Sequence, residues 1–164
     1  MKKTKHTTKA SSSSGYQRYA LLALRVIIGW FFLYSGLTKL MMDPAFNSAG
    51  FLVGAKTFQN FYHWLASAEN IGWVNFMNVW GQILIGAGLL TGTFTRLASY
   101  SAILMMALYY FPGLEFPKVE HGFLVDSHVI YAFALAVLAG FRAGDYLGVD
   151  QWISRYRSKA KVSK

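Results

Sequence analysis

Long apolar stretches with almost no charge constrain this chain more than any other feature of its sequence. Tyr19–Met41 contains only two charged side chains, Arg25 and Lys39, and Trp73–Phe94 contains none. Stretches of about 20 predominantly apolar residues can cross the hydrocarbon core of a bilayer as helices. Charged residues make up 14% of the chain, whereas soluble domains carry roughly 25%. The sequence therefore predicts a membrane protein, and its 164 residues are enough for one domain.

Two shorter uncharged stretches, Leu97–Phe111 and Ser127–Phe141, follow the first two. We therefore predict an all-α fold in which residues 19–150 form a bundle of four transmembrane helices. Between the first and second spans, Phe51–Ala68 places apolar side chains three and four residues apart, the pattern of an amphipathic helix. This extra helix is expected to lie along the outer membrane surface, with one face made of Phe58, Phe61, Tyr62 and Leu65.

Basic residues gather outside the apolar stretches, mainly in the tails formed by residues 1–18 and 151–164. We expect these polar tails to be disordered and cytoplasmic. Twelve of the sixteen Lys and Arg residues then lie inside: Lys2, Lys3, Lys5, Lys9, Arg18, Arg96, Arg142, Arg155, Arg157, Lys159, Lys161 and Lys164. Only Lys56 and Lys118 lie outside. Because cytoplasmic loops carry the excess of positive residues, we predict a multi-pass protein of the cell membrane with both termini in the cytoplasm.

Several kinds of chemistry are excluded by the residue types that the chain lacks or misplaces. There is no cysteine, which removes thiol catalysis, disulfides, iron–sulfur clusters and thiolate–metal sites. A b-type haem needs two buried axial histidines, and His128 is the only histidine in a predicted span, so neither haem nor metal is expected. The net charge of +9 comes mostly from the tails, where it favours anionic lipid over nucleic acid as a partner. Redox chemistry would therefore use a quinone, as a diffusible acceptor, or a partner subunit.

A candidate acid–base pair stands at the start of the fourth predicted helix, where Asp126 precedes His128 by two residues. Ionisable residues at the end of a span are candidates for function. Histidine titrates near neutral pH, so His128 can transfer the protons that quinone chemistry requires, and Asp126 can orient it. The alternative is structural: Asp126 caps the helix through its side-chain oxygen, and His128 lies at the membrane interface.

Lys39, Tyr34 and Tyr131 lie in the same outer layer of the bundle and are the candidate substrate-binding residues. Lys39 offers a positive charge for a small anion or for a quinone carbonyl. Alternatively, its side chain extends to the lipid interface. His63 is interpreted as a solvated surface residue rather than a ligand. Packing and an outer aromatic belt account for Met105, Met106, Tyr109 and Tyr110.

An inner layer contains Arg25 and the carboxylates that follow the fourth helix. A single arginine in hydrocarbon costs roughly 3 kcal/mol or more, so Arg25 is expected to face the bundle and pair with an anion. Asp150 is the preferred partner and Asp145 the alternative. This structural ion pair would tie the first helix to the last. In the second helix, Gln82 is expected to form an interhelical hydrogen bond.

Three stretches of the sequence resemble the DoxX/DoxD family of membrane proteins. They are LRVIIGWFFLYSGLTKL (Leu24–Leu40), GQILIGAGLLTGTFTRLAS (Gly81–Ser99) and LVDSHVIYAF…AGDYLGVDQW, which begins at Leu124. The resemblance implies a four-helix membrane protein, linked in some members to thiosulfate oxidation with quinone reduction and in others to accessory roles in redox complexes. Two positions depart from the family pattern, because relatives carry Glu where Gln82 stands and a basic residue where Asp145 stands.

The resemblance, taken with these candidate residues, implies a membrane-embedded, quinone-linked oxidoreductase subunit that oxidises a small sulfur anion such as thiosulfate. The alternative is a non-catalytic membrane anchor or assembly subunit for a redox partner complex. Expected partners are membrane lipid, a second redox subunit, and a second copy of the chain packed through the glycine-rich second helix, where Gly88 and Gly92 form a GxxxG pattern. A catalytic role requires Asp126, His128 and Lys39 to converge, whereas a scaffold would leave them apart.

Overall fold

A computed structural model describes residues 15–41, 46–119, 122–146 and 148–152 of the chain. The described part is 76% helical, with seven helices. The four longest are α1 (Gly15–Met41), α4 (Ile71–Thr91), α5 (Thr95–Gly113) and α6 (Ser127–Gly140). Helix α1 begins at Gly15, before the predicted start of the first span at Tyr19, so the last residues of the predicted N-terminal tail are helical. The rest of the two predicted tails, residues 1–14 and 153–164, lies outside the described residues.

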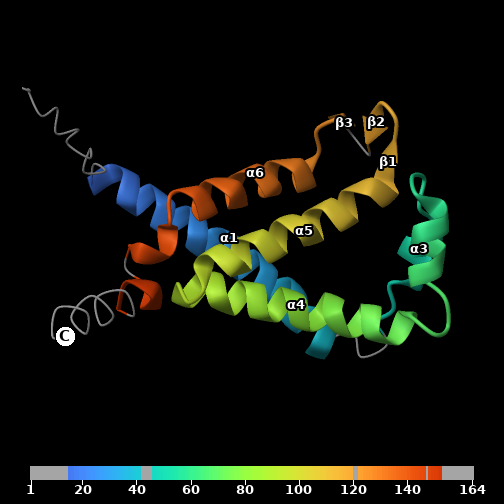
Figure 1. Cartoon of the computed structure of the whole chain (residues 1–164), viewed down its shortest axis with the longest axis horizontal. Coiled ribbons are helices and arrows are strands. Elements are labelled where there is room, and N and C mark those ends of the chain that lie inside the picture. Colours follow the sequence, from blue (N-terminus) through green and yellow to red (C-terminus); the bar gives the residue numbers. More distant parts are fainter. Residues whose placement is uncertain (1–14, 42–45, 120–121, 147, 153–164) are drawn as a thin grey trace, which may run out of the picture.

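The four long helices form one bundle. Helix α1 packs along α4, and α5 packs along α6. A short turn connects α4 to α5, and the two helices diverge from it towards the opposite end of the bundle (Figure 1). Their shared core is apolar, and its largest cluster of buried side chains includes Ile28, Phe32, Ile85, Leu89, Ala102, Met106, Leu135 and Leu138.

Two helices of the described chain, α1 and α4, are long and apolar enough to cross a membrane. Helix α6 is apolar but shorter. The prediction of a helical protein with membrane-spanning segments therefore holds for α1 and α4. The start of α1 and the described residues near the C-terminus lie at the same end of the bundle (Figure 1).

The single amphipathic helix predicted over Phe51–Ala68 is wrong, because this segment forms two short helices. They are α2 (Ala49–Val53) and α3 (Gln59–Leu65). Between them, Lys56 donates a backbone hydrogen bond to Pro112 O at 2.9 Å, and Phe58 adopts a positive φ of 53°. Contact with the end of α5 thus breaks the local helical pattern. Of the predicted apolar face, Tyr62 and Leu65 are buried, while Phe58 and Phe61 are exposed.

The loop predicted after the third span contains a small antiparallel sheet. Its three strands have two residues each: β1 (Leu114–Glu115), β2 (Lys118–Val119) and β3 (Gly122–Phe123). The sheet departs from a purely α-helical fold, and Val119 is its buried side chain. Together with α2 and α3 it forms the end of the bundle that is opposite the α4–α5 turn (Figure 1).

Glycines allow α1 and α4 to approach each other closely. A Cβ atom at Gly36 would meet Ile83, and one at Gly86 would meet the backbone of Leu33. Interfaces between membrane helices favour such small residues because the backbones can then come into contact. The two glycines of the GxxxG pattern also lie against other residues of the same chain. Gly88 lies next to Ala98, and Gly92, which has a φ of 71°, lies next to Arg25. A homo-oligomer through α4 would therefore have to use another face of this helix, and it stays a prediction.

Replacement of Gly86 by alanine is expected to destabilise the bundle by about 1–3 kcal/mol, because the added methyl group overlaps backbone atoms of α1 that cannot move independently. The matched control is Gly72→Ala in the same helix, where an added Cβ has no neighbour within 4 Å. Thermal unfolding in detergent, followed by tryptophan fluorescence, measures the difference. Equal unfolding temperatures for the two variants would contradict the close α1–α4 packing.

Candidate functional site

Asp126 and His128 lie in direct contact at the start of α6. Asp126 Oδ1 accepts a hydrogen bond from the backbone N–H of Val129 at 3.1 Å, so Asp126 caps the helix. Its other oxygen, Oδ2, lies 2.5 Å from His128 Nδ1. The Asp126 side chain is 6% exposed and that of His128 is 23% exposed. The two interpretations of Asp126 are therefore compatible, since one oxygen caps the helix while the other orients the imidazole.

The contact between these side chains defines which ring nitrogen is available for chemistry. An ionised carboxylate only accepts hydrogen bonds, so an aspartate at this position favours the tautomer with a proton on Nδ1. Neutral His128 then keeps Nε2 as an acceptor that can take a proton and release it again. This is the arrangement that a proton-transfer residue requires.

Tyr109 connects this pair to the rest of the site. Its ring contacts the His128 ring edge to face, with the centroids 6.1 Å apart. The Lys39 ammonium lies 6.0 Å from the centroid of the same tyrosine ring. The Tyr109 hydroxyl accepts a hydrogen bond from Gln82 Nε2 at 3.3 Å, which is the interhelical bond expected of Gln82. Residues from α1, α4, α5 and α6 thus meet around one tyrosine that the sequence suggested only as packing.

Lys39 points into the bundle rather than towards the lipid interface. Its ammonium donates a 2.8 Å hydrogen bond to Asn78 Oδ1 on α4 and lies 4.7 Å from the centre of the Phe46 ring. The faces of the Phe46 and Tyr109 rings attract the ammonium and hold it in this position. Lys39 therefore belongs to the same cluster as His128, through Tyr109.

The two other candidate substrate-binding residues are placed differently. Tyr131 is half-buried and stacks on Phe31 with ring centroids 4.9 Å apart. Tyr34 is 57% exposed and contacts Trp30 on the outer face of α1. Tyr34 thus faces away from the cluster. His63 is exposed, and its Nε2 lies 3.1 Å from Val53 O.

A cavity of about 460 Å³ lies between α4 and α5 where these helices diverge. Its walls are almost entirely apolar, and the polar side chains that line it at the end away from the α4–α5 turn include Asn78 and Tyr109. We call it the α4–α5 groove. Ligand pockets typically measure roughly 300–1,000 Å³ and combine apolar walls with a few polar groups. Tyr109 therefore lies both in the groove and against His128.

Helices α2 and α3 cover the end of the groove that lies away from the α4–α5 turn. Tyr62 of α3 is 2% exposed, and its hydroxyl donates a hydrogen bond to Leu108 O at 3.1 Å. Burial raises the pKa of the Tyr62 phenol, so this hydroxyl stays protonated and keeps its donor. Leu52, Tyr62 and Leu65 pack together against Val74 and Phe111 at the ends of α4 and α5. The cover is thus fixed to both walls.

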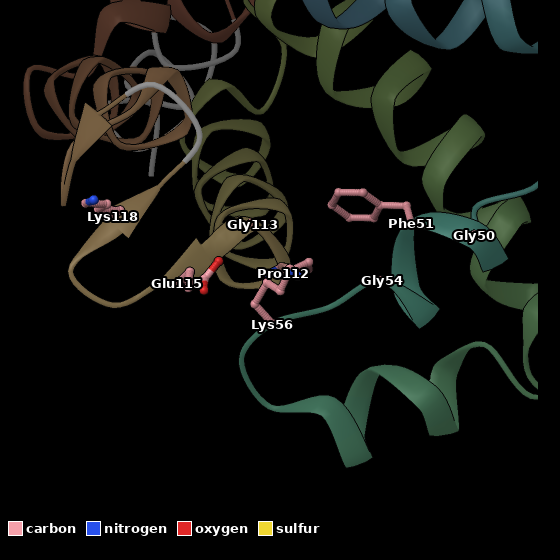
Figure 2. Close-up of a pocket in the computed structure, with 8 residues that line it drawn as sticks. All are labelled: Gly50, Phe51, Gly54, Lys56, Pro112, Gly113, Glu115 and Lys118. Carbon is pink, nitrogen blue, oxygen red and sulfur yellow. The ribbon is translucent and has the colours of Figure 1, made fainter.

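A second cavity, of about 520 Å³, lies at the outer surface between α2 and the end of α5 (Figure 2). Its ionisable lining residues are Lys56, Glu115 and Lys118. Lys118 stands on β2, opposite Glu115 in the β1–β2 pairing. None of the site residues predicted from the sequence lines this cavity.

Arg25 and Asp150 lie at the opposite end of the bundle, and both contact the backbone. Arg25 is 1% exposed. Its Nη1 donates hydrogen bonds to Ala143 O at 2.9 Å and to Tyr146 O at 3.2 Å. Asp150 accepts hydrogen bonds from the backbone N–H groups of Phe94 and Thr95, at 2.8 and 2.9 Å. The opposite charges attract each other, and both residues hold the segment after α6 against the end of the bundle that contains the α4–α5 turn.

The alternative partner for Arg25, Asp145, lies on the surface of this segment. Its carboxylate pairs with Arg142, with Arg142 Nε and Asp145 Oδ2 3.6 Å apart. Asp150 instead caps α5, because the first amides of a helix have no partner within the helix. Its backbone N–H also donates to Gly92 O at 2.9 Å, next to the α4–α5 turn. Hydrogen bonds from side chains to backbone groups therefore hold the segment after α6 at the end of the bundle that contains the α4–α5 turn.

A model of the DoxX family matches residues 20–112, which is more than half of the chain. The chain belongs to the DoxX family. No curated protein and no solved structure matches it. The match to DoxX confirms the family suggested by the sequence, and with two apolar helices of spanning length it indicates a membrane protein.

The DoxX match covers only part of the candidate site. Lys39, Asn78, Gln82 and Tyr109 lie within the matched residues, whereas Asp126 and His128 lie beyond them. Within the described chain, no group of three or more His, Asp or Glu side chains could hold a metal ion.

Proposed function

We propose that this DoxX protein is a membrane-embedded, quinone-linked oxidoreductase subunit that oxidises a small sulfur anion such as thiosulfate. One observation carries the proposal: Tyr109 lines the apolar α4–α5 groove and also contacts both His128 and Lys39. A quinone site needs an apolar cavity, hydrogen-bonding groups and a residue that transfers protons. A site for a sulfur anion needs a fixed positive charge. These requirements meet around a single ring.

In the proposed reaction, two thiosulfate anions join through a new sulfur–sulfur bond and release two electrons. The quinone takes up these two electrons and two protons and becomes the quinol, so atoms and charge balance. His128 delivers protons through Nε2, and Asp126 holds the imidazole by Nδ1 and stabilises its charged form. The positive charge of the Lys39 ammonium stabilises the bound thiosulfate anion.

We further propose that α5 and α6 cross the membrane with α1 and α4, which gives four spans. Support comes from their outer faces, which carry exposed apolar side chains one helical turn apart. On α5 these are Leu97, Tyr100, Leu104 and Leu108, and on α6 they are Ile130, Phe133 and Val137. An apolar surface of this extent is unfavourable in water and favourable in lipid.

The bias of Lys and Arg towards one side supports an orientation in the cell membrane with both termini in the cytoplasm. The cluster around Tyr109 would then open towards the outside. Cysteine scanning tests this orientation, because a single cysteine at Lys118 should react with an impermeant maleimide in intact cells. A cysteine at Arg96 should react only after the cells are opened.

Turnover of the purified protein tests the proposed activity. The protein in nanodiscs is mixed with thiosulfate and decylubiquinone, and quinone reduction is followed optically. An organic extract of the preparation is also examined for bound quinone. Turnover supports the proposal, whereas absence of both turnover and bound quinone favours the alternative of an anchor or assembly subunit. Proteins that co-purify with the chain would then identify the redox partner.

Replacement of Lys39 by methionine is expected to raise the KM for thiosulfate by about tenfold or more, since one hydrogen bond from a charged donor contributes roughly 1.5–3 kcal/mol. The kcat should change less, because the proton-transfer pair is untouched. Lys56→Met, at the separate outer cavity, is the control. An unchanged KM in Lys39→Met would remove Lys39 from the anion site.

A further inference from the structure

The α4–α5 groove is elongated along the helix axes. On α4 its lining extends from Trp73 to Ile85, which corresponds to roughly 18 Å of helix at 1.5 Å per residue. On α5 the lining extends from Ser101 to Tyr109. The rim consists of exposed apolar side chains, among them Met77, Leu84 and Leu104. In a bilayer such a rim opens the groove sideways to the hydrocarbon, so a long apolar ligand can enter directly from the membrane.

Most polar side chains that line the groove, namely Ser48, Tyr62, Asn78 and Tyr109, lie at the end that α2 and α3 cover, and Ser101 lies towards the other end. Asn78 and Tyr109 are uncharged, and Tyr62 fixes the cover above them through its bond to Leu108 O. A phospholipid head group at this position would have to leave water and lie beneath the cover, where no charged side chain of the described residues lines the groove to pair with its phosphate. Lys39 and His128 contact Tyr109 but do not line the groove. A small uncharged ring with carbonyl oxygens meets no such penalty, because those oxygens accept hydrogen bonds.

We propose that the α4–α5 groove binds a membrane quinone along its length, with the ring beside Tyr109 and Asn78 and the isoprenoid tail directed towards Leu84 and Ser101. This inference rests on the proposed function and assigns its quinone site. The tail lies against apolar walls, and the ring lies on the tyrosine that contacts His128. The length of the groove thus selects a tailed quinone over a small soluble one.

Photo-crosslinking tests this binding mode without requiring electron transfer. The probe is a ubiquinone analogue with a diazirine at the far end of an alkyl tail, added to the protein in phosphatidylcholine nanodiscs. Mass spectrometry of digested protein is expected to locate the label near Leu84 and Ser101. Decylubiquinone at a tenfold excess over the probe, with both near saturation, should reduce this labelling about tenfold by mass action.

A groove-filling variant sharpens the experiment. Ser101 lines the groove and is exposed, so Ser101→Trp fills space without disturbing the core. Labelling at Leu84 should be lost in this variant. The matched control is Tyr100→Trp, because the neighbouring Tyr100 is 53% exposed on the same helix and does not line the groove. The control should be labelled as strongly as the unmodified protein.

Three results would overturn the inference. The label could spread evenly over the lipid-facing helices, it could persist in excess decylubiquinone, or a diazirine fatty acid could label the groove equally and compete with the quinone. The last result would identify a general lipid site. Specific, competed labelling in a protein without turnover would instead retain the quinone groove and reject the proposed oxidation of thiosulfate. Turnover without labelling of the groove would retain the proposed oxidation of thiosulfate and reject the groove as the quinone site.

Discussion

Replacement of His128 by alanine is expected to lower quinone reduction by a factor of about 10²–10⁴, the contribution of a positioned acid–base group. The variant loses the ring that Asp126 orients and Tyr109 contacts, so protons reach the quinone only through water. Folding should be nearly unaffected, because Asp126 still caps α6 through Oδ1. Quinone reduction in nanodiscs and thermal unfolding of the same preparation provide the two measurements.

Two further variants separate catalysis from structure in this prediction. His63→Ala removes an exposed histidine outside the cluster and should leave turnover unchanged. Asp126→Asn keeps an oxygen for the helix cap but removes the negative charge beside the imidazole, so activity should fall and its pH profile should shift while the unfolding temperature stays close to normal. If His128→Ala fails to express or to fold, His128 is a structural residue.

Replacement of Arg25 by alanine is expected to destabilise the protein by about 2–6 kcal/mol, because it leaves two carbonyl acceptors without their donor and each such loss costs roughly 1–3 kcal/mol. Arg25 is buried, and its guanidinium holds the carbonyl groups of Ala143 and Tyr146. Alanine leaves these acceptors without that donor and leaves Asp150 without the positive charge that attracts it. Unfolding followed by tryptophan fluorescence measures the loss.

The matched control for Arg25 is Arg96→Ala, since Arg96 is exposed near the same end of the bundle. This variant should unfold at a temperature close to that of the unmodified protein. Arg25→Lys keeps the charge but loses the planar set of donors, so its stability should lie between the two. A stability of Arg25→Ala equal to that of Arg96→Ala would show that the inner end does not depend on this side chain.

The features that the sequence revealed depend on short-range patterns. Length and apolar character placed the long helices, because a membrane-spanning helix satisfies its backbone hydrogen bonds within one segment. The cap of α6 by Asp126 was readable for the same reason, since a capping side chain bonds to an amide three residues away. The family could be read from three stretches of the sequence that resemble DoxX proteins and follow one another along the chain.

Other features required contacts between residues far apart in the sequence. The predicted amphipathic helix breaks into α2 and α3 where Lys56 bonds to Pro112 at the end of α5. Tyr109 looked like an aromatic-belt residue, and only the packing of α5 against α6 and α4 brings it to His128 and Gln82. Its position at the same depth as His128 was the one available signal. Asp150 was assigned to Arg25, yet its hydrogen bonds cap α5.

The sequence by itself determined that this is a helical membrane protein of the DoxX family, with its ionisable residues at the two ends of the bundle. Hydropathy and helix caps act over one or a few turns, so they can be read without the fold. Only the tertiary structure decided that α4 and α5 diverge, that α2 and α3 cover the resulting groove, and that Tyr109 joins it to His128 and Lys39. These relations depend on how the four helices pack. The packing contacts join side chains that are far apart in the sequence, so a local sequence pattern does not reveal them.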